Sequence, residues 1–131
     1  MIVDFHTHIL PDRFEQHREK YLTMDTSFAE LYSGPKSKIV TAENLINSMN
    51  INGVDISVVM GIGWSNIDMA MEANDYIIES VQRYPTRLVG FFSVNPAWGE
   101  SALKEMERCS NAGLRGIGEL HPTTQGFSMK E

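Results

Sequence analysis

Two of the four histidines of this chain lie one residue apart near its start, in the segment MIVDFHTHIL. Residues 2–7 alternate apolar and polar side chains, which is typical of a β-strand. On a strand, side chains at positions i and i+2 project from the same face, so we expect His6 and His8 to point the same way. Two imidazole nitrogens on one face can bind one divalent cation. The alternative is two surface histidines that share a strand end by chance.

A carboxylate and another histidine follow the last predicted strand, in the segment GIGELHP. Glu119 and His121 are again two residues apart, and the glycines before them leave room close to the backbone. Together with two imidazoles, the Glu119 carboxylate would complete the two-nitrogen, one-oxygen donor set of many catalytic metal sites. Glu119 alone could instead pair with Arg115 or Lys104 at the rim. His121 is interpreted either as a substrate or acid–base group or as a turn residue before Pro122.

The pattern of apolar residues predicts strands and helices in strict alternation. Runs rich in β-branched residues indicate strands, and amphipathic segments between them indicate helices. Alternation with helical crossovers predicts a parallel sheet in an α/β fold, whose ligands bind at the carboxyl ends of the strands. The predicted strands are 2–7, 54–60, 87–94 and 114–120, and the predicted helices are 41–53, 67–84 and 101–110.

Two regions lie outside this alternation. Residues 10–40 are irregular, and we expect one short helix there, around residues 14–21. Trp64 and Gln125 lie in loops after the second and fourth predicted strands, on the same edge as the candidate ligands. We expect these two side chains to shape a substrate pocket, with ordinary loop packing as the alternative.

The composition excludes several classes of function. The chain has 131 residues, of which 42% are hydrophobic and 21% charged, as expected for one folded domain. The formal net charge is -6 without a basic cluster, so we expect no nucleic-acid partner. No segment approaches the roughly 20 apolar residues of a membrane span, so we expect no membrane association. The single cysteine, Cys109, cannot form a disulfide within the chain, which favours the cytoplasm.

Four segments of the chain resemble successive blocks of one enzyme family. They are MIVDFHTHIL, GVDISVVMGIG, EANDYIIESVQRYPTRLVGFFSVNP and GLRGIGELHPTTQGF. These blocks are similar to the metal-dependent amidohydrolase superfamily, and most similar to its amidohydrolase-2 branch, which includes aminocarboxymuconate-semialdehyde-decarboxylase-like proteins. The resemblance covers nearly the whole chain except the irregular segment around residues 11–40. It implies a (β/α)8 TIM barrel with one or two divalent metals at its top face.

The resemblance also implies roles for individual residues. His6 and His8 correspond to the first-strand metal ligands. Glu119 falls in a fourth-strand block where one branch of relatives carries a metal-bridging glutamate and other branches a lysine. His121 is the candidate catalytic group. The implied reaction is hydrolysis of an amide, ester or related bond in a small-molecule substrate by a metal-activated water, with zinc expected and manganese, iron or nickel as alternatives.

Three other functions remain open from the sequence. Some relatives use the same metal site for non-oxidative decarboxylation. A PHP-type phosphoesterase also ends its first strand in H-x-H, although the loop ILPDRFEQ lacks the Ser-Asp-Gly pattern that such domains tend to carry. A non-catalytic binding or assembly module would use the same α/β framework without a metal.

The predicted elements fall short of a full barrel. A (β/α)8 barrel needs about 250 residues, and four strands are predicted here. The family's later ligands, histidines on strands five and six and an aspartate on strand eight, have no counterpart in this sequence. We therefore expect one domain, residues 1–131, that corresponds to the first four βα units as a truncated or half barrel and is inactive by itself.

We predict that the chain associates with itself, because an open half of a barrel exposes sheet edges and apolar strand faces. Sedimentation or light scattering of the purified chain should then give a mass above that of one chain. A stable, monodisperse monomer would contradict this prediction.

Overall fold

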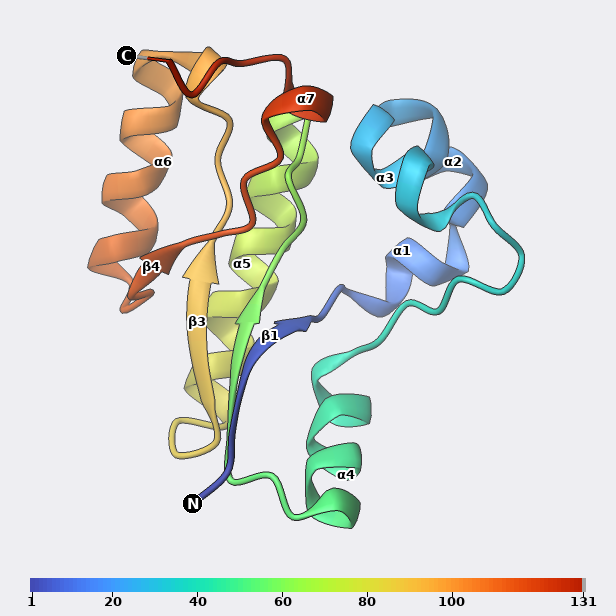
Figure 1. The fold of residues 1–131 in the computed structure, drawn as a ribbon, viewed down its shortest axis with the longest axis vertical. Helices are drawn as coiled ribbons and strands as arrows, with labels where there is room; N and C mark the ends of the chain where they lie inside the picture. Colours follow the sequence, from blue (N-terminus) through green and yellow to red (C-terminus); the bar gives the residue numbers. More distant parts are fainter. Residues whose placement is uncertain (131) are drawn as a thin grey trace.

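The computed structural model of the chain describes residues 1–130 (Figure 1). Within them, four parallel strands form one sheet in the order β1-β2-β3-β4, and each strand pairs with the next one along the chain. The strands are β1 (Val3–His8), β2 (Ile56–Met60), β3 (Leu88–Phe92) and β4 (Gly116–Ile117). The predicted α/β fold with a parallel sheet is confirmed, and its strand order is that of the first four units of a (β/α)8 barrel.

Three longer helices connect the strands close to where the sequence predicts them. The Thr41 hydroxyl accepts a hydrogen bond from the Asn44 backbone N–H at the start of α4, and Gly53 ends this helix at a φ of 70°. The Asn66 side chain caps α5 in the same way. The longer helices are α4 (Ala42–Asn52), α5 (Ile67–Arg83) and α6 (Glu100–Asn111), and two short ones are the 3-10 helix η1 (Pro96–Trp98) and α7 (Pro122–Gln125).

One hydrophobic core joins these helices to the sheet. It contains Met49 of α4, Ile77 of α5 and Cys109 of α6, which pack together with Val59 of β2 and Leu88 of β3. The burial pattern of β2 confirms that this strand is enclosed on both faces, since four of its five residues are buried.

The irregular segment forms three helices, so the prediction of a single one around residues 14–21 was wrong. They are α1 (Asp12–Gln16), α2 (Arg18–Met24) and α3 (Thr26–Tyr32). Their aromatic side chains pack around the fully buried Trp64, with the rings of Phe14 and Phe28 centred 5.8 and 6.1 Å from the indole. This contact spans many residues along the chain, so local patterns do not reveal it.

A buried carboxylate fixes α3 against the loop that follows β2. Asp25 is 2% exposed, and it accepts hydrogen bonds from the backbone N–H groups of Phe28, Ser65 and Asn66 at 2.7 to 2.9 Å. Buried carboxylates need such partners, because an unpaired buried charge is costly. The three bonds hold α3 beside the carboxyl end of the sheet.

The fourth strand is much shorter than the predicted 114–120. Only Gly116 and Ile117 pair with β3, at Phe91 and Phe92. Gly118 N–H still donates to the carbonyl of Phe92 in β3 at 2.9 Å, whereas Glu119 N–H donates to the Gly61 carbonyl, just after β2, at 3.1 Å. The chain therefore leaves the edge of β3 and crosses to the end of β2 (Figure 1).

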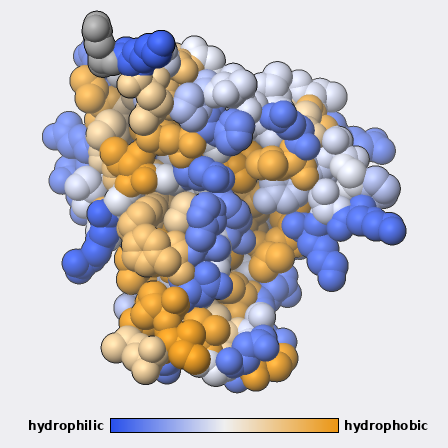
Figure 2. Space-filling model, viewed as in Figure 1, coloured by the Kyte–Doolittle hydropathy of each residue, from blue (hydrophilic) through white to orange (hydrophobic). Residues whose placement is uncertain are grey.

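Apolar side chains remain exposed along the sheet. Phe5 is 65% exposed and meets Phe91 edge to face with ring centroids 6.0 Å apart. Figure 2 shows hydrophobic residues gathered over the lower part of the face that is in view. The exposed apolar residues of β1, β4 and the segments beside them are Ile2, Val3, Phe5, Ile117 and Leu120. Self-association stays a prediction.

Within residues 1–130, no helix combines the length and apolar character needed to cross a bilayer.

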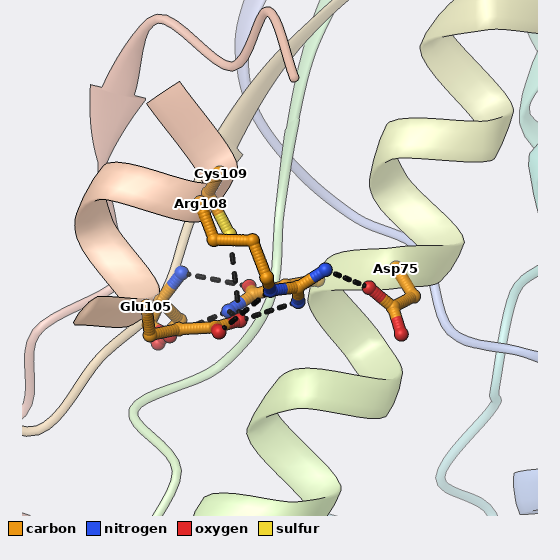
Figure 3. A network of polar contacts seen from close by, with 6 residues as sticks. Asp75, Glu105, Arg108 and Cys109 are labelled. Atoms are coloured by element: carbon orange, nitrogen blue, oxygen red, sulfur yellow. Dashed lines mark hydrogen bonds and ion pairs between the residues drawn. The ribbon is translucent and has the colours of Figure 1, made fainter. Parts of the chain in front are cut away.

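A polar network joins α5 to α6 (Figure 3). The Glu105 carboxylate is 3% exposed, and it accepts hydrogen bonds from Arg108 at 2.7 and 2.9 Å and from the buried Asn74 amide at 3.1 Å. Burial alone would raise the pKa of the Glu105 carboxyl, but the bonds from Arg108 and Asn74 outweigh it and lower the pKa. Burial raises the pKa of the neighbouring Cys109 thiol to about 12, which fits a packing role rather than a nucleophile.

We predict that Glu105→Gln lowers the free energy of unfolding at pH 7 by about 1–3 kcal/mol, because Arg108 and Asn74 lose a charged acceptor. The lowered pKa means that Glu105 stabilises the fold above the ordinary carboxyl pKa of 4.5 and that this stabilisation disappears as the pH falls through the folded-state value. The free energy of unfolding, measured with urea, should therefore depend less on pH below pH 4.5 in the variant than in the unmodified protein. The exposed Glu107→Gln on the same helix is the control, and equal behaviour of the two variants would contradict the prediction.

Candidate metal centre

The two histidine side chains at the end of β1 lie on the same side of the sheet. Their Nε2 atoms are 3.1 Å apart, and their rings meet edge to face with centroids 4.9 Å apart. His8 is partly buried, whereas His6 is more exposed. The structure thus brings together the pair of nitrogens that the H-x-H spacing predicts.

β1 contains an irregularity in its register within the segment that carries His6. Asp4 pairs with Ser57 and Thr7 pairs with Val59, so three steps along β1 match two along β2. Such a bulge re-aims side chains and is common next to functional sites. The Asp4 carboxylate accepts a hydrogen bond from the His6 backbone N–H at 3.3 Å and has no hydrogen bond to either imidazole.

The backbone of β2 selects the tautomer of His8. His8 Nδ1 lies 3.2 Å from the Met60 carbonyl oxygen, which can only accept a hydrogen bond. Nδ1 therefore carries the hydrogen, and in the neutral ring Nε2 has a lone pair that faces His6 Nε2 at 3.1 Å. Metal-binding histidines commonly use such an acceptor to fix the ring.

Glu119 reaches this pair because the chain crosses from β4 to the end of β2. Its carboxylate oxygens lie 3.5 Å from His8 Nε2 and 3.8 Å from His6 Nε2. The Ser93 hydroxyl, 3.2 Å from the Glu119 carbonyl oxygen, supports the crossing from below. Lys104 pairs with Glu100 instead, so the alternative of a Glu119–Lys104 ion pair at the rim is not observed.

The three donors fit a single cation by type and spacing. One ligand atom from each of His6, His8 and Glu119 can be chosen so that all lie within 4.8 Å of one another. Two ligands that bind one zinc ion at about 2.0–2.2 Å lie roughly 2.8–3.6 Å apart. The separation of the two imidazole nitrogens and that between His8 and Glu119 fall in this range, and the third is slightly longer.

A cavity of about 310 Å³ adjoins the donors. Glu119 forms part of its wall together with His121 and Thr124, and α3 contributes Ser27, Glu30 and Leu31. Gly63 completes the wall, and a Cβ atom there would lie 2.8 Å from that of His121, so glycine permits this close approach. The structure places His121 beside the donors, where the sequence predicts a catalytic group.

The two predicted substrate contacts are buried instead. Trp64 is fully buried in the aromatic cluster under α1 and α3. Gln125 is 5% exposed in α7, where its amide donates to the Trp64 and Val94 carbonyls and accepts from the His121 backbone N–H at 2.7 Å. Both side chains pack and position the loops, so the alternative of loop packing describes them better in this structure.

Sequence reasoning missed the contribution of α3 to this site. Ser27 and Glu30 lie in the segment that was expected to be irregular, and Tyr32 faces the same region. Burial raises the pKa of the Tyr32 hydroxyl, and the Glu119 carboxylate raises it further. The Asp25 cap of α3 was the one local signal that could have identified this helix.

The sequence of this chain is similar to those of known proteins. The family model described as Amidohydrolase matches residues 3–129. A 2-amino-3-carboxymuconate-6-semialdehyde decarboxylase from Dictyostelium discoideum is 27% identical over an alignment of 139 positions, which includes 88% of this chain and 39% of that protein.

Solved structures share the fold at lower identity. A 5-carboxyvanillate decarboxylase from Novosphingobium aromaticivorans, with bound manganese and 3-methoxy-4-hydroxy-5-nitrobenzoic acid, matches at a TM-score of 0.74 and 20% identity, over 100% of this chain and 44% of that one. A 4-oxalomesaconate hydratase from Rhodopseudomonas palustris matches at a TM-score of 0.58 and 22% identity, over 89% of this chain and 40% of that one.

The chain thus spans about two fifths of the length of these relatives. The family match covers nearly all of the chain, including both histidines of β1 and the crossing segment with Glu119. By this match, the chain is a member of the amidohydrolase family.

Proposed function

We propose that this chain supplies a divalent-metal site and part of the substrate pocket of an amidohydrolase-family enzyme that acts on a small carboxylated molecule. The observation that carries the proposal is the convergence of His6, His8 and Glu119 at one point, with Glu119 also forming part of the wall of a cavity. Family membership favours this function over a PHP-type phosphoesterase or a module without a metal.

Non-oxidative decarboxylation is the reaction that we favour. The curated relative and a structural neighbour are both named as decarboxylases, and the neighbour's structure holds manganese. Metal-assisted hydrolysis, the reaction first expected from the sequence, is the second candidate because the same donor set suits it. Manganese and zinc are accordingly the metals to test first.

Each residue of the site would have a separate role in this reaction. The bound cation would supply a Lewis acid for a substrate oxygen. His8, with Nδ1–H held by the Met60 carbonyl, presents a lone pair without reorientation. Glu119 offsets part of the cation's charge. His121 lines the same cavity, where its ring can take a proton from a substrate hydroxyl or from water and then give it to the carbon atom that the carboxylate leaves.

We predict that the metal-free chain binds one Mn²⁺ or Zn²⁺, measured by isothermal titration calorimetry. His8→Ala and Glu119→Gln should each weaken binding at least about tenfold, because each removes a donor or its charge. His17→Ala is the matched control, since His17 is an exposed histidine between α1 and α2. Absence of stoichiometric binding, or equal binding by the control and the donor variants, would refute the metal site.

We expect a complete enzyme that contains this chain, supplied with Mn²⁺, to release CO2 from 5-carboxyvanillate or a related aromatic carboxylate, with the activity lost in His8→Ala and retained in His17→Ala. Release of CO2 can be followed by a coupled assay, and hydrolysis of a lactone or amide probe can be followed in parallel. Metal-dependent hydrolysis without any CO2 release would replace decarboxylation by the second candidate.

A further inference from the structure

Hydrogen bonds connect three side chains on the wall of the cavity, those of His121, Thr124 and Glu30. The Thr124 hydroxyl lies 2.7 Å from His121 Nδ1 and donates to a Glu30 carboxylate oxygen at 3.1 Å. Glu30 comes from α3 and Thr124 from α7, so the contact joins residues that are 94 positions apart. All three residues line the cavity next to Glu119.

The number of available hydrogens determines which atom donates in each of these two hydrogen bonds. An ionised carboxylate can only accept, so the single hydroxyl hydrogen of Thr124 is used toward Glu30. The hydroxyl oxygen must then accept from His121, which places a hydrogen on Nδ1. In the neutral ring this leaves Nε2 bare, and Nε2 has no hydrogen-bond partner within residues 1–130.

Buried groups hold the backbone at both ends of this hydrogen-bond network, at His121 and at Glu30. The Gln125 amide holds the backbone of His121, and it is itself anchored on the Trp64 carbonyl. The buried Asp25 carboxylate anchors α3, which carries Glu30. Because the backbones at both ends are held, the Thr124 hydroxyl and the imidazole do not need to search for each other.

We propose that Thr124 and Glu30 are positioning residues that hold His121 in the Nδ1–H tautomer and thereby leave Nε2 free to exchange a proton with the substrate. This inference rests on the proposed function, because a bare Nε2 has a catalytic use only beside a bound substrate. It assigns α3, from the segment outside the sheet, a role in the chemistry of the site.

The test is the tautomer of His121 in the metal-free protein, read from the ¹⁵N and ring ¹H NMR signals at a pH where the ring is neutral. In the unmodified protein, Nδ1 should have the signal of an N–H nitrogen and Nε2 that of a bare one. Thr124→Val and Glu30→Ala should both move the majority to the Nε2–H form, which is the form that an unconstrained histidine favours. Thr124→Ser should restore the Nδ1–H form.

Matched controls separate this effect from a general change in the fold. Thr123→Val alters the exposed neighbour in the same helix, and Glu19→Ala removes an exposed carboxylate on α2, so both should leave the tautomer unchanged. A majority of Nε2–H in the unmodified protein, or a tautomer that neither Thr124→Val nor Glu30→Ala shifts, would overturn the inference. Since no metal is present, failure here is distinguishable from failure of the calorimetric test of metal binding.

Discussion

One backbone contact determines whether a site exists at all. The hydrogen bond from Glu119 N–H to the Gly61 carbonyl takes the chain away from the edge of β3 and across to the end of β2. If β4 had continued to residue 120 as an ordinary strand, Glu119 would be held at the sheet edge rather than beside the histidines of β1. The convergence of the three donors depends on this crossing, and so does the cavity that Glu119 helps to enclose.

The site joins two kinds of structure. The two histidine donors come from the end of β1, whose geometry the parallel sheet fixes, and Glu119 comes from the crossing segment after β4. The opposite wall of the cavity comes from α3, which aromatic packing around Trp64 and the buried Asp25 carboxylate hold in place. The sheet therefore presents the two imidazoles, the crossing segment adds the Glu119 carboxylate, and the segment between β1 and α4 supplies groups that shape what can bind beside them.

Much of this arrangement could be predicted from local patterns in the sequence. The H-x-H pair, the cap of α4 at Thr41 and the alternation of strands and helices are local signals, and the structure agrees with each of them. The bulge in β1, the three helices of residues 12–32 and the burial of Trp64 depend on contacts between distant residues. Trp64 illustrates the difference, because a loop position indicates exposure whereas aromatic neighbours from two helices enclose it.

The most direct test of the account is the position of a metal in a crystal of this protein soaked in Mn²⁺. We expect one anomalous scattering peak about 2.0–2.3 Å from Nε2 of His6, Nε2 of His8 and a carboxylate oxygen of Glu119. A peak at another place, or a site that lacks either imidazole or the Glu119 carboxylate, would contradict it.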